Sequence, residues 1–78
     1  MYLGLEIGTT ATKAVLVDEH HAIVATATAG YSLYQPTPEI SEFDPQAWID
    51  AVRSVVAALR AEKPAALQAV RAIGLSGQ

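Results

Sequence analysis

The apolar positions of this chain first form extended runs and later repeat at helical spacing. Apolar-rich runs predict three strands, near 2–7, 11–18 and 22–29. The first two are separated by a short turn at 8–10, and the polar turn that follows the second begins at its last residue, Asp18, and ends at His21. Because both connections are short, the strands are expected to form an antiparallel meander. The first run is apolar on both faces, which predicts a central strand covered on both sides.

The apolar spacing then changes to that of a helix near 45–61. Asp44 and Pro45 are typical of an N-cap and a first helical position, and Pro64 predicts an end near Glu62. The apolar stripe expected to pack on the sheet consists of Trp48, Val52, Val55, Val56 and Leu59. Within this stripe Trp48 is expected to be a core residue. A further helical turn is expected after Pro64, then a fourth strand over 71–75 and a loop over 76–78. The resulting order is β-β-β-α-β, an α/β fold.

Composition indicates that these residues belong to a larger structure. The chain has 78 residues, of which 51% are hydrophobic and only 17% are charged. A chain of this length buries only a thin core, so some apolar faces should pack against elements outside it. We therefore expect residues 1–78 to be the N-terminal part of a longer protein.

Charge and cysteine content exclude several functions. The net charge is −3 and the five cations are spread along the sequence, so a nucleic-acid surface is not expected. The absence of cysteine excludes disulfides and thiolate metal sites and fits a cytoplasmic protein. No apolar run is long enough to span a bilayer, which argues against membrane insertion. The adjacent His20 and His21 are expected to be solvated turn residues.

Candidate chemistry surrounds the first turn. Glu6 ends the first strand, Gly8, Thr9 and Thr10 form the turn, and Lys13 lies just inside the second strand. Glycine lets the backbone approach a ligand and adopt unusual dihedral angles, and successive amides at a turn can bind an anion. With hydroxyls, one acid and one cation added, the segment could hold a phosphate chain and its metal ion. A plain structural hairpin with a solvated lysine is the alternative.

Three segments together resemble a known family. Glu6–Thr10 with Lys13 is similar to the first phosphate motif of the actin, Hsp70 and sugar kinase superfamily, whose ribonuclease-H-like fold starts β-β-β-α-β. The segment 41–48, SEFDPQAW, resembles the Glu-x-Asp-Pro-x-x-Trp segment of the FGGY carbohydrate kinases. The segment 73–78, IGLSGQ, resembles the strand and loop before their sugar-contacting residues. Residues 1–78 then correspond to the N-terminal part of the first FGGY kinase domain, a phosphate-binding hairpin plus a crossover helix.

The resemblance implies ATP-dependent phosphorylation of a sugar hydroxyl with Mg²⁺ present. The residues expected to bind the ATP phosphates are Gly8, Thr9, Thr10 and Lys13. Glu6, at the position where the family usually has aspartate, would orient water in the Mg²⁺ shell, and Gln78 would stand at the edge of the substrate loop. The catalytic base and the adenosine pocket of the family lie outside these residues, so the fragment alone is expected to be inactive.

The segments are most similar to those of xylulokinases, which implies conversion of D-xylulose to D-xylulose 5-phosphate by the full-length protein. Gluconate, ribulose and fuculose kinases remain alternatives within the family. Outside it, an activator ATPase of the 2-hydroxyacyl dehydratase type and an actin-like assembly module remain open. The expected partners are a small-molecule sugar and ATP, with no nucleic acid and no membrane; a homodimer of the full-length protein is left open.

Overall fold

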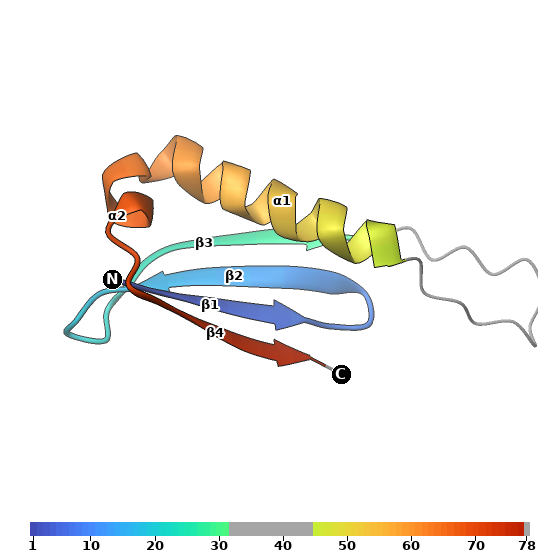
Figure 1. Ribbon diagram of the computed structural model, residues 1–78, viewed down its shortest axis with the longest axis horizontal. Coiled ribbons are helices and arrows are strands. Elements are labelled where there is room, and N and C mark those ends of the chain that lie inside the picture. The colour runs from blue at the N-terminus through green and yellow to red at the C-terminus, as the bar shows by residue number, and fades with distance from the viewer. Residues whose placement is uncertain (32–44, 78) are drawn as a thin grey trace, which may run out of the picture.

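The computed structural model describes residues 1–31 and 45–77 and shows helices on one side of a sheet (Figure 1). The elements are β1 (Tyr2–Ile7), β2 (Ala11–Val17), β3 (Ile23–Gly30), α1 (Pro45–Glu62), α2 (Pro64–Gln68) and β4 (Ala72–Gly77). The predicted α/β class and element order are confirmed. The largest difference in bounds is at β4, which extends through Ser76 and Gly77, where a loop was predicted.

The sheet has the strand order β3-β2-β1-β4. β2 pairs antiparallel with both β1 and β3, so the predicted meander is confirmed. β4 pairs in parallel with β1 after the helical crossover, and Glu6 lies opposite Ser76 in that register. Because parallel strands end on the same side, the carboxyl ends of β1 and β4 lie at one edge of the sheet (Figure 1).

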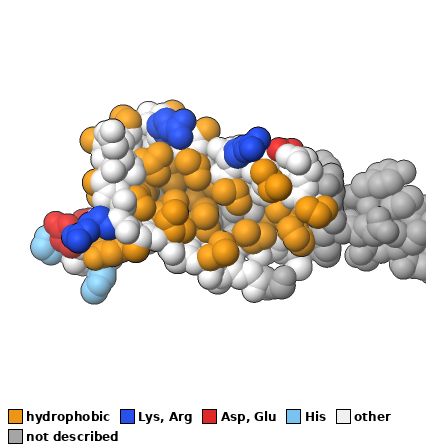
Figure 2. Space-filling view, in the orientation of Figure 1, with side chains coloured by type: hydrophobic (Ala, Val, Ile, Leu, Met, Phe, Trp, Pro, Cys, Tyr) orange, Lys and Arg blue, Asp and Glu red, His pale blue; other side chains and the backbone are white. Residues whose placement is uncertain are grey.

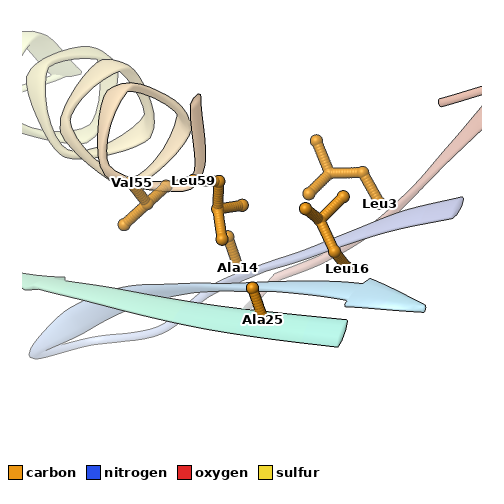
Figure 3. Packing of buried hydrophobic residues seen from close by; sticks show 6 residues of the cluster. All are labelled: Leu3, Ala14, Leu16, Ala25, Val55 and Leu59. Carbon is orange, nitrogen blue, oxygen red and sulfur yellow. The ribbon is translucent and has the colours of Figure 1, made fainter. Parts of the chain in front are cut away.

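The core lies between α1 and the face of the sheet formed by alternate residues of the strands. Figure 3 shows Val55 and Leu59 reaching from α1 toward this face. The buried cluster consists of Leu3, Ala14, Leu16, Ala25, Val55 and Leu59. Two of the four strand residues in the cluster are alanines, whose small side chains let the helix pack close to the sheet.

The helical stripe differs in part from the prediction. Val55 and Leu59 are buried as expected, and Ala51, which was not in the predicted stripe, is buried as well. Trp48, Val52 and Val56 are only half-buried, because α1 packs over β2 and β3 rather than over β1 and β4. The prediction that Trp48 is a core residue is therefore wrong for the described residues, and the predicted stripe is only partly buried.

The central strand β1 is covered on one face only. Leu3 is buried beneath the helix layer, whereas Glu6, on the opposite face, is exposed. β4 is exposed throughout, with Ile73 at 62% and Leu75 at 70% of their full exposure. Coverage of both faces was predicted, and within the described residues it is absent.

The end of α1 follows from proline chemistry, as predicted. The Lys63 amide donates the last bond to the Leu59 carbonyl, and Pro64, which has no N–H, begins α2. Asp44, the predicted N-cap, lies outside the described residues. None of the helices in the described part of the chain could cross a bilayer.

The β2–β3 turn is built around Asp18. Its Oδ1 accepts hydrogen bonds from the amides of His20 at 2.8 Å and Ala22 at 3.0 Å. His21 has φ 65°, the left-handed region, and its amide donates to the Asp18 carbonyl. Both histidines are exposed, in agreement with the prediction of a solvated turn.

The two amide bonds make the turn sensitive to pH. The bond from Ala22, then that from His20, lowers the pKa of the Asp18 carboxyl below its ordinary value of 3.8. A lowered folded pKa adds stability that is fully present above pH 3.8 and is lost as pH falls through the folded pKa. Asp18→Asn, which keeps an acceptor but not the charge, should therefore lower the thermal midpoint of the whole protein at pH 7. The difference from the parent should shrink in acid; a difference that stays constant from pH 7 to pH 3 would contradict this.

Candidate functional site

The residues predicted from the sequence to form the site lie at one end of the molecule. The β1–β2 turn, the carboxyl end of β4 and the first turn of α1 all lie there (Figure 1). Ligands of open α/β sheets commonly bind beyond the carboxyl ends of parallel strands. The topology therefore places the Gly8–Thr10 turn where such a ligand would bind.

The turn itself is tight. The Gly8 amide donates to the Ala11 carbonyl at 2.9 Å. A Cβ at Gly8 would lie 3.1 Å from the same oxygen, so a side chain there would crowd the backbone. No glycine in the described ranges has positive φ, so the expectation of unusual dihedral angles at Gly8 is wrong. The position favours glycine because of close backbone approach.

Thr9 and Thr10 are the exposed part of this turn. Since the Gly8 amide is used within the turn, anion binding there would depend on the amides and hydroxyls of the two threonines. The Thr10 carbonyl accepts a bond from the Tyr31 amide at 3.0 Å, which ties the turn to the end of β3. The turn is thus held by the backbone while its two hydroxyl side chains face outward.

A row of polar side chains crosses the sheet on the face opposite α1. Glu6 lies opposite Lys13 on β2 and opposite Ser76 on β4, and Lys13 lies opposite Thr28 on β3. Side chains at directly opposed positions have Cβ atoms about 5 Å apart. The acid and the cation of the sequence motif are therefore neighbours, and both are exposed.

A shallow hollow adjoins this row. Its volume is about 210 Å³. It is lined by Gly4, Leu5, Glu6, Lys13, Val15 and Ser76. Gly4 pairs with Gly74 on β4, and an added Cβ at Gly74 would meet nothing within 4 Å. Because the two glycines carry no side chains, nothing from these positions covers the sheet beside Glu6, and this leaves room for a ligand.

A second, apolar cavity lies on the helix side of the same edge. It has a volume of about 550 Å³. Its lining is formed by Ile7, Gly8, Thr9, Trp48, Leu75, Ser76 and Gly77. Figure 2 shows hydrophobic side chains gathered across the middle of the viewed surface. Trp48, predicted as a core residue, instead forms one wall of this open cavity.

Ser76 was assigned to a loop edge by the sequence, and no role at the motif was predicted for it. Its neighbour relation to Glu6 depends on the register of β4 on β1, for which the sequence carries no local signal. Gln78, the predicted edge of the substrate loop, lies outside the described residues.

The donors present fit a phosphate chain with Mg²⁺. Exposed hydroxyls and one ammonium suit phosphate oxygens, and a single exposed carboxylate suits an ion that keeps most of its waters. Within 1–31 and 45–77, no three His, Cys, Asp or Glu side chains form a cluster that could hold a metal. Glu6 could therefore act on a metal site indirectly, through a water of the ion's shell.

The sequence matches a described family along its whole length. Residues 1–78 match the N-terminal domain of the FGGY family of carbohydrate kinases. The xylulose kinase of Escherichia coli K12 is 36% identical over 78 residues, which cover 100% of this chain and 16% of that protein. The gluconokinase of Bacillus subtilis 168 is 39% identical over 62 residues, 80% of this chain and 12% of that protein.

Solved structures agree with this match. A crystal structure from Brucella ovis, described as that of a "xyloylose kinase", superposes with a TM-score of 0.93 at 45% identity. The superposition covers 99% of this chain and 16% of that one. The chain thus has the sugar kinase fold of the actin-like superfamily, as predicted, and spans only about a sixth of the length of these relatives.

Proposed function

Because the chain belongs to the FGGY family of carbohydrate kinases, we propose that the whole protein phosphorylates a sugar hydroxyl with ATP and Mg²⁺, and that D-xylulose is its substrate. The family match supports a kinase over the activator ATPase and the actin-like module. The similarity to xylulose kinase over all 78 residues supports the choice of sugar. The observation that carries the proposal is the exposed Thr9–Thr10 turn beside the Glu6–Lys13 pair.

Each site residue has a proposed part. Thr9 and Thr10 bind phosphate oxygens through hydroxyls and amides, Gly8 permits the close backbone, and Lys13 adds a positive charge beside them. Glu6 orients a water of the Mg²⁺ shell from the neighbouring strand. ATP would supply the phosphoryl group, and the Mg²⁺ bound to it would neutralise the negative charge that develops during transfer.

The reaction needs groups beyond residues 1–78. The sugar hydroxyl oxygen forms the new bond to the γ-phosphorus, the bond to the bridging oxygen breaks, and ADP leaves with that electron pair. The hydroxyl proton passes to a base that we place in another segment, so residues 1–78 alone are proposed to be inactive. We propose that they form the N-terminal part of the first kinase domain, with the cytoplasm as compartment; a homodimer of the whole protein stays a prediction.

D-Gluconate is the second candidate substrate, because the B. subtilis gluconokinase is also similar over 62 residues. The whole protein should be assayed for ADP release with D-xylulose, D-gluconate, D-ribulose and L-fuculose at equal concentration. We expect the highest kcat/KM with D-xylulose. A higher value with D-gluconate would replace the proposed sugar, and no ADP release above background with any sugar would contradict the kinase function.

A further inference from the structure

Tyr31, just after β3, holds the β1–β2 turn through two separate bonds. Its amide donates to the Thr10 carbonyl at 3.0 Å, and its hydroxyl lies 2.5 Å from the Thr12 hydroxyl. Both partners lie at the start of β2 or in the turn before it, 19 and 21 residues before Tyr31 in the chain. A residue distant in sequence thus fixes the segment that carries the candidate phosphate donors.

The Thr12 hydroxyl is an unusual group in this fold. Thr12 is 0% exposed, and it is the one buried polar side chain in the part of the chain that the structure describes. It lies on the helix-covered face, opposite Ile7 on β1 and Ala29 on β3. A buried hydroxyl without a partner is costly, so its bond to the Tyr31 hydroxyl is strongly favoured over none.

The two bonds have different effects on the turn. The amide bond restrains the Thr10 carbonyl, and because a peptide unit is planar, it also restrains the peptide plane that joins Thr10 to Ala11. The hydroxyl bond anchors the residue after Ala11 from the helix side. The backbone on the C-terminal side of the exposed threonines is therefore fixed at two points. On the N-terminal side, the bond from the Gly8 amide to the Ala11 carbonyl closes the turn.

We propose that Tyr31 is a positioning residue for nucleotide binding: its bond to the buried Thr12 hydroxyl holds the Gly8–Thr10 turn in the conformation that receives the ATP phosphates. Tyr31 does not itself touch the phosphates in this account. The inference rests on the proposed kinase function and adds to it a residue that lies outside the phosphate motif. Donors that are already fixed bind phosphate without the entropic cost of ordering the turn. Loss of the Tyr31–Thr12 bond should therefore raise the KM for ATP more than the KM for the sugar.

The test uses three variants of the whole protein, Tyr31→Phe, Thr12→Val and the double variant. Phenylalanine keeps the ring and valine keeps the shape of threonine, so each single change removes one hydroxyl. We expect each to raise KM for ATP about three- to tenfold, the range that one hydrogen bond supports, with kcat and the sugar KM within about twofold of the parent. The KM for ATP of the double variant should be no higher than that of the single variant with the higher KM, because both changes break the same bond.

Controls separate positioning from folding. Thr12→Ser keeps the hydroxyl and should restore the ATP KM to the parent value. Tyr2→Phe removes an exposed hydroxyl on β1 and should change no kinetic constant. All assays are run well below the thermal midpoint of each variant, so a merely structural role would lower that midpoint and leave the ATP KM unchanged. That outcome, or equal rises in the ATP and sugar KM values, would overturn the proposal.

Failure of the two proposals can be told apart. A parent protein that phosphorylates a sugar, together with variants whose ATP KM equals that of the parent, would overturn only the role of Tyr31. A parent protein that releases no ADP with any sugar would overturn the kinase function and this role together. Amide hydrogen exchange gives a readout besides activity: the amides of Gly8 and of residue 31, which donate to the Ala11 and Thr10 carbonyls, should exchange faster in Tyr31→Phe and at the parent rate in Tyr2→Phe.

Discussion

Replacing Glu6 by glutamine in the whole protein is expected to lower kcat about 10- to 100-fold, while the KM for the sugar changes little. Outer-shell groups of a metal site typically contribute this much to metal affinity or activity. Glutamine keeps the size of the side chain and removes its charge, so the effect isolates the negative charge beside the transferring phosphoryl group. Steady-state kinetics with varied sugar at saturating ATP and Mg²⁺ measure it.

Two matched variants sharpen this prediction. Glu19→Gln makes the same change on an exposed glutamate in the β2–β3 turn, at the opposite end of the sheet, and should leave kcat unchanged. Glu6→Asp restores the residue usual in the family and should match or exceed the parent. If the aspartate variant is much slower, the site has adapted to the longer side chain, and the assignment of Glu6 to a family-type metal position fails.

Leu59→Ala is expected to destabilise the domain by about 2–5 kcal/mol, the usual range for a leucine removed from a closed core. Leu59 is 0% exposed and packs from α1 into the cluster that contains Leu16 and Ala14. The alanines opposite it cannot expand to fill the cavity. Differential scanning calorimetry of the whole protein would show a lower transition for the domain that contains these residues.

The matched control is Leu59→Met, which nearly conserves volume and should cost less than about 1.5 kcal/mol. A Leu59→Ala protein with the melting temperature of the parent would show that α1 does not close the core as described.

The strands and the main helix could be predicted because local patterns specify them. Pro64 ends α1 through its own chemistry, and the short polar turns allow only antiparallel neighbours for β1, β2 and β3. The register of β4 on β1 could not be predicted from the sequence, since it depends on where the helical crossover places the start of β4 beside β1. For that reason Ser76 was assigned to a loop, although it lies in a strand beside Glu6.

The coverage of each face was also hard to predict. Apolar spacing gives the side of a helix that packs but not the strands on which it packs, so Trp48 was assigned to the core and Ala51 was omitted. For the site, the motif predicted Glu6 and Lys13 as candidate residues, and the antiparallel register of β1 and β2 makes them neighbours. The bonds of Tyr31 could not be predicted, because no local pattern links it to Thr12.

The central claim is that the Gly8–Thr10 turn binds the phosphates of ATP, and kcat/KM for ATP in Thr9→Val and Lys13→Ala tests it most directly. Both side chains are exposed, so neither change should disturb the core. Thr26→Val, the same change at an exposed position on β3, serves as the control. We predict that kcat/KM for ATP falls about tenfold or more in both site variants, the loss of one charge-assisted hydrogen bond, and stays at the parent value in the control. Parent values in both site variants would show that the turn is only a structural hairpin.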